Sequence, residues 1–241
     1  MASEPSAQAP ASSDSAFGRI FGVFFSPGKT FEAIALRPTW FAPLVLWLLC
    51  SVGVSAVVLP RVDFEKLTRD RIEKSGRPLP EDQIQTMVDR QRKVAPIVGY
   101  CISVIAPIFI SLVVAVTLWG SFRAFGWDAT FRQSLGATTH AFLPGVLGTL
   151  LLLPLLLRQD RVDPDAIGDM LRSNLGFLVE RSSKALHSLL GSVDLFSFWT
   201  LAMLVVGFAA AARIRRGQAA GVVVGLWLVY VLGKAGISAL F

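Results

Sequence analysis

The most regular feature of the sequence is the alternation of long apolar runs with charged segments. The runs that are long enough to cross a bilayer are residues 40–59, 94–120, 134–157, 195–212 and 217–240. A hydrocarbon core about 30 Å thick needs about 20 residues of helix, because every backbone amide must find its partner within its own segment. The pattern therefore predicts an all-α fold, a polytopic membrane helix bundle of five transmembrane helices with additional amphipathic helices at the membrane interface.

The region before the first run divides into a polar tail and an amphipathic stretch. Residues 1–16 are small and polar and lack the basic start of a signal peptide, so we expect a disordered tail. A helix is predicted from Pro27 to about Leu36, with Phe31 and Ile34 on one face. Such a helix suits the plane of the membrane interface.

Two long loops separate the apolar runs. The hydrophilic loop 61–93 is predicted to form two short solvated helices, the first ended by Gly76 and the second opened by Pro80. This loop is either an exposed, charge-rich hairpin or a docking face for a partner. In loop 158–194, leucines and valines recur at helical spacing from Leu175 to Val193, which predicts an amphipathic segment on the membrane surface or against the bundle. The domain organisation expected is the tail and one membrane domain, 17–241.

Composition agrees with a membrane location. Hydrophobic residues make up 53% of the chain and charged residues 17%, which is too apolar for a soluble globular domain. The net charge of +6 is spread between the apolar runs, so it gives no basic patch for nucleic acid. Cys50 and Cys101 both lie in uncharged runs, which excludes a disulfide framework and a CxxC redox or metal site.

The remaining chemistry consists of ionisable groups and prolines inside the apolar runs. His140 could take part in a proton or substrate path, or could hydrogen-bond a neighbouring helix. Pro107 and Pro144 could break helices where a substrate binds, or could produce only kinks. Lys234 could pair with an acid, or could extend its ammonium to the headgroups. These four residues are the candidate intramembrane site.

No catalytic motif accompanies these candidates. The sequence has no HExxH, no GxSxG, no P-loop and no Rossmann fingerprint, so we expect no enzyme activity and no cofactor. The acidic residues Asp160, Asp163, Asp165 and Asp169 lack the glycine turn and terminal glutamate of a calcium loop. They fit a solvated loop better than a metal site.

Small residues near the end of the chain predict close helix packing. Gly221 and Gly225 are four residues apart in the last run, and the fourth run contains Gly207 followed by several alanines. Because the connection between these two runs is short, we expect an antiparallel hairpin in which these small residues pack against each other.

Two phrases of the sequence resemble a known family. The phrase FSPGKTFEAIALRPTWFAPL leads into the first run, and Asp194, Leu195, Phe196 and Trp199 lie at the entry to the fourth. This pattern is similar to the bacterial branch of the Yip1 family of five-span membrane proteins. The resemblance implies a polytopic membrane protein without catalytic residues. Eukaryotic members engage Rab-type GTPases, but their DLYGP phrase before the first span is absent here.

These observations lead to two functional hypotheses. The first is a non-enzymatic scaffold or adaptor that organises membrane proteins or lipids, with the bilayer, other membrane proteins or further copies of the chain as partners. The alternative is a small permease or channel component with a path through the second and third spans. The richness in Ala, Gly and Arg favours a bacterial plasma membrane. The resemblance implies a cytoplasmic N-terminus, whereas basic residues are more numerous on the side of the two long loops.

Overall fold

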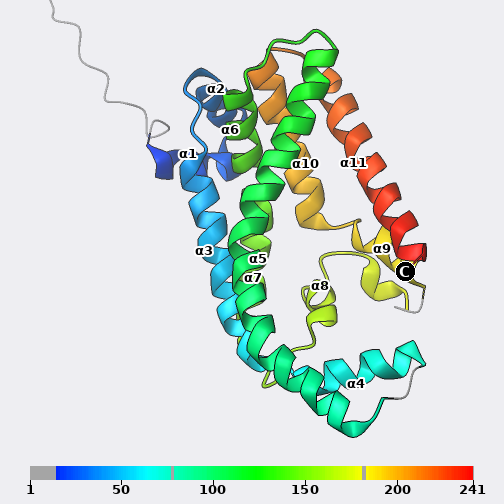
Figure 1. Cartoon of the computed structure of the whole chain (residues 1–241). Helices are drawn as coiled ribbons and strands as arrows, with labels where there is room; N and C mark the ends of the chain where they lie inside the picture. Colours follow the sequence, from blue (N-terminus) through cyan, green and yellow to red (C-terminus); the bar gives the residue numbers. More distant parts are fainter. Residues whose placement is uncertain (1–14, 77–78, 181–182, 241) are drawn as a thin grey trace, which may run out of the picture. The chain divides into compact units, whose positions relative to one another are not determined.

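The computed structural model of the chain is helical, and it describes residues 15–76, 79–180 and 183–240. The predicted tail lies largely outside this range, since residues 1–14 are not described, and the first helix begins at Ala16. The described helices include α1 (Ala16–Phe25), α2 (Pro27–Leu36), α3 (Phe41–Val58), α4 (Phe64–Ser75), α5 (Glu81–Ala124), α6 (Phe131–Ala141), α7 (Leu143–Leu157), α8 (Ile167–Met170), α9 (Lys184–Gly191), α10 (Leu195–Ala212) and α11 (Arg216–Leu240) (Figure 1).

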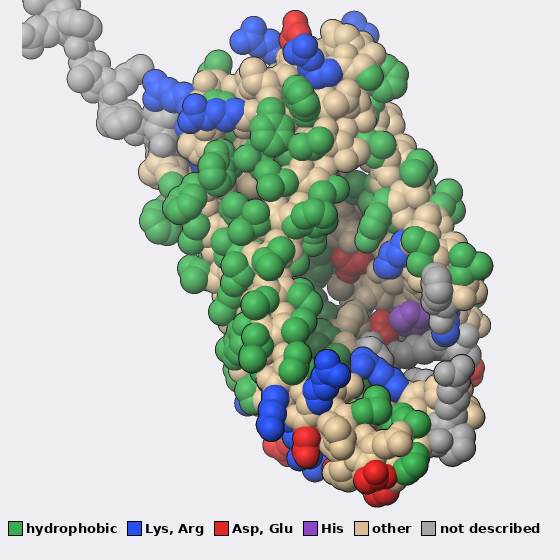
Figure 2. Space-filling view, viewed as in Figure 1, with side chains coloured by type: hydrophobic (Ala, Val, Ile, Leu, Met, Phe, Trp, Pro, Cys, Tyr) green, Lys and Arg blue, Asp and Glu red, His purple; other side chains and the backbone are tan. Residues whose placement is uncertain are grey.

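Five segments are long and apolar enough to cross a membrane, as the sequence predicts. They are Phe41–Arg61, Glu81–Ala124, Phe131–Leu157, Leu195–Ala212 and Arg216–Leu240. Large apolar side chains of α5 are exposed along most of its length, among them Ile102, Ile105 and Phe109. Such a surface is stable only where lipid replaces water. Figure 2 shows the apolar side chains gathered along this helix.

The chain divides into two compact units, each built from several parts of the sequence. The first contains Met1–Val45, Ser111–Gly145 and Phe196–Gly233, and the second contains Leu46–Ile110, Val146–Leu195 and Lys234–Phe241. The candidate residues His140 and Pro144 fall in the first unit, and Pro107 and Lys234 fall in the second.

In the first unit, α1, α2 and α6 pack together (Figure 1). Phe31 of α2 is buried, and its ring lies so close to Gly207 of α10 that a Cβ at Gly207 would come within 2.9 Å of it. The same Cβ would be 3.1 Å from Ala137 of α6. The apolar face of α2 is therefore covered by protein.

Two polar contacts fasten α2 to its neighbours. The N-terminus of α6 has a capping box formed by Thr130 and Gln133, and Gln133 Nε2 also donates to the carbonyl of Ala35, 2.8 Å away. Arg19 of α1 is only 3% exposed, and its guanidinium donates to the carbonyl of Arg37 and to Thr39 Oγ1. A buried charge needs such partners, so Arg19 fixes α1 to the turn after α2.

The predicted packing of Gly221 and Gly225 in the α10–α11 hairpin is wrong. A Cβ at either position would meet nothing within 4 Å in the described part of the chain. The short connection does join α10 directly to α11, but the glycine stripe of α11 is left open. Close approach occurs instead at Gly207, and its neighbours come from α2 and α6.

The second unit has an apolar cluster where the long loops begin. Val58 at the end of α3, Leu156 at the end of α7 and Val162 are buried together, and Ile167 and Met170 pack against them. The loop after α7 is therefore folded onto the ends of two spans.

The two predicted helices of loop 61–93 are present, with one difference. The first is α4, and Gly76 ends it with a positive φ of 65°. The second is not separate, because α5 is continuous through Pro96 and Pro107 into the second span. With 44 residues, α5 is about 66 Å long, roughly twice the thickness of the hydrocarbon core. Its first turns therefore project beyond the membrane.

Candidate functional site: a polar pocket in the second long loop

Polar side chains of the second long loop and of the end of α11 line a pocket of about 610 Å³, which we call the α8–α9 pocket. Its lining residues are Gly168, Asp169, Asn174, Lys184, His187, Ser188, Gly191, Lys234, Ile237 and Ser238. All of them belong to the second unit. Figure 2 shows histidine, acidic and basic side chains gathered on this part of the surface.

The fold of the loop depends on Asn174. Its side-chain oxygen accepts from the backbone N–H of Gly176, 2.8 Å away, and its amide nitrogen donates to the carbonyl of Gly168, 2.9 Å away. The preceding Arg172 has a positive φ of 49°, a conformation that turns the chain sharply. These contacts hold the loop beside α8, and residues of α8 and α9 both line the pocket.

This turn corrects the interpretation of the leucine pattern between Leu175 and Val193. The segment is not one amphipathic helix, because the described residues from 175 to 180 contain the 3-10 turn Gly176–Leu178 and no α-helix, and α9 begins at Lys184. The helix predicted to start at Asp163 and Pro164 is present as a short 3-10 turn followed by α8.

The side chains of His187 and Asp169 are within hydrogen-bond distance of each other in the pocket. The distance between His187 Nε2 and Asp169 Oδ2 is 3.2 Å, and their side chains are 25% and 19% exposed. Asp169 comes from α8 and His187 from α9, so the contact joins the two short helices. It also fixes which nitrogen of the imidazole faces the carboxylate.

Lys234 contributes the pocket wall from α11. Its ammonium donates to Ser192 Oγ, 3.3 Å away, and Ser192 in turn donates to the carbonyl of Ser188. The hydroxyl of Ser188 is buried, and the described residues provide no hydrogen-bond partner for it. The pocket lining thus contains cationic groups and one residue, Ser188, whose buried hydroxyl has no partner among the described residues.

The other intramembrane candidates are not among the residues that line this pocket. His140 is 1% exposed, and its Nδ1 lies 2.9 Å from the carbonyl of Gly136 in the same helix. Pro144 lies just after Phe142, the single residue between α6 and α7, which keeps helical backbone angles within the third span. Pro107 is buried in the uninterrupted α5.

The acidic run of this loop is spread out by the fold. Asp163 precedes a 3-10 turn and Asp169 faces His187, while the side chain of Asp165 is outside the described set. Within the described ranges, no three potential metal ligands come together.

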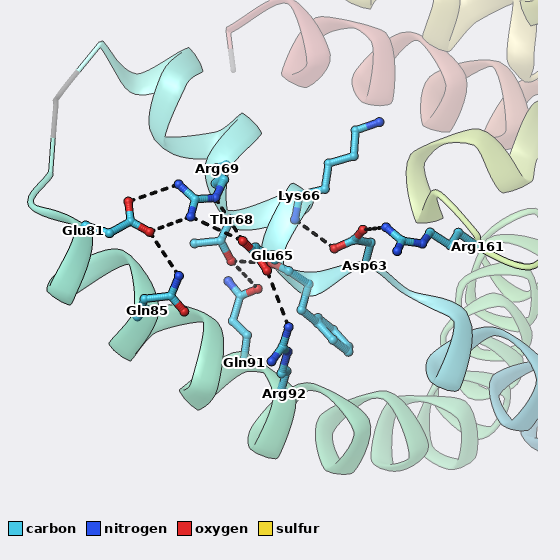
Figure 3. A network of polar contacts seen from close by, with 11 residues as sticks. Asp63, Glu65, Lys66, Thr68, Arg69, Glu81, Gln85, Gln91, Arg92 and Arg161 are labelled. Atoms are coloured by element: carbon cyan, nitrogen blue, oxygen red, sulfur yellow. Dashed lines mark hydrogen bonds and ion pairs between the residues drawn. The ribbon is translucent and has the colours of Figure 1, made fainter.

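The two long loops are joined at their beginnings. Val62 and Val162 form a parallel backbone bridge, in which Val162 N donates to the carbonyl of Arg61 at 2.9 Å. The guanidinium of Arg161 is paired with the carboxylate of Asp63, which also caps α4 by accepting from Lys66 N (Figure 3). The Lys66 N–H and then the charge of Arg161 hold the pKa of Asp63 below its ordinary value of 3.8.

The hairpin of α4 and α5 is held by polar and apolar contacts. Arg69 pairs with Glu65 one turn before it and with Glu81 at the start of α5, where the closest approach is 2.6 Å (Figure 3). Thr68 is buried and donates to Gln91 Oε1 at 3.1 Å, and Val88 is fully buried. Because Arg69 and its partners are exposed, their ion pairs contribute little to the stability of the hairpin. The buried residues Thr68 and Val88 contribute more.

Sequence reasoning did not find the pairing of Asp169 with His187 or the burial of Arg19. Arg19 carries a recognisable signal, since it is the one charge in the apolar stretch from Phe17 to Phe25. The contact of His187 with Asp169 has no such signal, because it depends on the turn at Asn174.

Comparison with known proteins identifies the family. The model of the Yip1 domain matches residues 21–237, which is most of the chain. The chain is 25% identical over 199 residues to "Membrane protein YknW" of Bacillus subtilis (strain 168), covering 82% of this chain and 80% of the relative. No solved structure matches the chain. With five segments able to span a membrane and a family match over nearly its whole length, the chain is a multi-pass membrane protein that belongs to the Yip1 domain family.

Proposed function

We propose that this protein is a non-enzymatic scaffold or adaptor, which presents its two long loops as one joined surface to other membrane proteins or to lipids. The observation that carries the proposal is the joining of the loops. The bridge of Val62 to Val162 and the ion pair of Asp63 with Arg161 connect segments 98 residues apart. Loops that only link spans do not need such contacts.

The α4–α5 hairpin supports the same proposal. Because α5 continues into the second span, a partner that contacts the projecting hairpin is connected to that span through a single helix. Met87 on this hairpin is 41% exposed although its neighbour Val88 is fully buried. An exposed apolar side chain among charges is a suitable contact for a partner.

The orientation that we propose keeps the N-terminus in the cytoplasm of a bacterial cell and places both loops on the outer side. Partners would then be other proteins of the envelope, further copies of the chain or lipids. The permease hypothesis has no comparable support, because His140 is buried and its Nδ1 lies beside a carbonyl of its own helix.

Photo-crosslinking in intact cells tests the scaffold proposal. A photoreactive amino acid is placed at Met87 on the hairpin or at Leu178 in the second loop, which is 65% exposed. We expect both positions to capture the same partner, whether protein, second copy or lipid, because the two loops form one surface. Val229 on α11 is an exposed control position in a span.

Two charge variants sharpen this test. Arg161→Asp breaks the contact between the loops, and we expect it to lower the yield of the shared adduct by up to about fivefold, since an exposed ion pair contributes up to about 1 kcal/mol. Arg158→Asp makes the same charge change three residues earlier, where no ion pair is formed within the described residues, and should leave the yield unchanged. Different partners at the two positions, or no adduct at either, would refute the proposal.

A further inference from the structure

We propose that the α8–α9 pocket binds a phosphate group, which is presented by the headgroup of an anionic phospholipid. This ligand site lies in the second of the two joined loops, and its binding of a phosphate does not rest on the scaffold role. Three features of the pocket support this ligand: its depth in the membrane, its charged groups and the buried hydroxyl of Ser188.

The position of Lys234 sets the depth of the pocket. In α11, Arg216 and Lys234 are separated by 18 residues, a helix length of about 27 Å, close to the hydrocarbon thickness of about 30 Å. The residues between them are uncharged and mostly apolar. One charged group therefore lies at each headgroup level, and the pocket lined by Lys234 lies where lipid phosphates are found.

The polar groups of the pocket suit a singly charged phosphodiester. Among the described lining residues, Lys184 and Lys234 carry ammonium groups, and Asp169, which contacts His187, carries a carboxylate. Within the described part of the chain, the buried Ser188 Oγ has no hydrogen-bond partner. Cationic and neutral donors of this kind bind phosphate oxygens strongly.

The size and surroundings of the pocket favour a lipid over a larger ligand. A volume of about 610 Å³ is within the usual range for sites of small ligands and headgroups. On the membrane side of Lys234, the apolar side chains of Val229 and Leu232 of the same helix are exposed. These side chains give acyl chains a surface below the cationic group.

Native mass spectrometry of the purified full-length protein tests the inference. The protein is mixed with phosphatidylglycerol or with phosphatidylcholine of the same acyl chains, and the lipid that remains bound is measured. We expect preferential retention of phosphatidylglycerol. Lys184→Gln with Lys234→Gln should reduce that retention by about tenfold or more, since each charge-assisted bond contributes about 1.5–3 kcal/mol.

Matched variants keep the result interpretable. Lys29→Gln with Arg158→Gln removes the same charge at exposed positions outside the pocket lining and should leave retention unchanged. Lys184→Arg with Lys234→Arg keeps both positive charges and should keep the preference for phosphatidylglycerol. That result would show that the pocket tolerates substitution of both lysines. Equal retention of the two lipids, or unchanged retention in the double glutamine variant, would overturn the inference.

A competition arm separates a lipid from a soluble phosphate. Glycerol 3-phosphate added in millimolar excess should not displace phosphatidylglycerol if the acyl chains contribute to binding. If it displaces the lipid fully through the same lysines, the pocket binds a soluble phosphate and the lipid assignment is overturned. The crosslinks at Met87 and Leu178 are read out independently, so failure here is distinguishable from failure of the scaffold proposal.

Discussion

At the scale of single residues, the packing of the first unit depends on a few positions. At some of them a glycine allows close contact, and at others a buried polar side chain is hydrogen-bonded. Gly207 lets the ring of Phe31 lie directly against the backbone of α10, and Arg19 holds α1 through two oxygen acceptors. Both positions are close to α2, so this short helix is an integral part of the first unit.

The contact between Gly207 and Phe31 gives a direct prediction. In Gly207→Ala the new Cβ would lie 2.9 Å from Phe31 Cδ1, closer than normal packing allows. We expect a loss of about 1–3 kcal/mol in the free energy of unfolding, the usual cost of overpacking. The midpoint of thermal denaturation of the purified protein in detergent should fall accordingly.

Gly221→Ala is the matched control, because its Cβ meets no described atom within 4 Å. Its midpoint should stay the same or rise slightly, since alanine favours the helix. Equal midpoints for Gly207→Ala and Gly221→Ala would contradict the packing of α2 described here.

Residue-level reasoning from the sequence found groups that are conspicuous in the chain and missed groups that the fold assembles. Lys234 is the only charge in its apolar run, so it could be singled out, and the structure places it in the pocket wall. Asp169 and His187 are unremarkable in the sequence because their contact is created by the turn at Asn174. Hydrophobic periodicity carries no information about such a turn.

At the scale of elements, the sequence predicted which segments are helical more accurately than where each helix begins and ends. It counted the second span from residue 94, because charges end the apolar run there, but helix α5 extends back to Glu81. No glycine or proline interrupts residues 81–93, and charged residues are compatible with a helix outside the bilayer. In the second long loop, the sequence predicted more continuous amphipathic structure than is present. The leucine spacing continues from Leu175 to Val193, but the turn at Arg172 and Asn174 starts an irregular segment before α9.

The cap of α4 should be sensitive to acid. In the folded protein the pKa of Asp63 is lowered, so the ionised carboxylate stabilises the start of α4 at any pH above the ordinary pKa of an aspartate. This contribution to stability is lost as the pH falls through the pKa of the folded state. Between about pH 5 and pH 3, amide exchange in α4 should therefore accelerate relative to the intrinsic rate.

Asp63→Asn isolates this effect from the other carboxylates of the hairpin. Asparagine also caps helices, so the bond to Lys66 N is kept, whereas the titrating charge beside Arg161 is removed. We expect a smaller acid-dependent increase in exchange than in the unmodified protein. The same increase in both proteins would show that Asp63 does not control this end of α4.

At the scale of the whole molecule, the count of spans and the joining of the loops support each other. Two spans separate loop 61–93 from loop 158–194, so a five-span topology places both loops on one side of the membrane. The contacts between Val62 and Val162 and between Asp63 and Arg161 require the same. The sequence predicted the shared side but not the contacts, which join residues far apart in the chain.

The most direct test of this arrangement is cysteine labelling with an impermeant maleimide in intact cells. Cys50 and Cys101 are replaced by alanine, and single cysteines are placed at Ser6, Ser75, Asp128, Ser183 or Gln218. The account predicts labelling at Ser75 and Ser183 only, with the other three positions labelled after the membrane is opened. Labelling of only one of Ser75 and Ser183 in intact cells would contradict the five-span structure with joined loops.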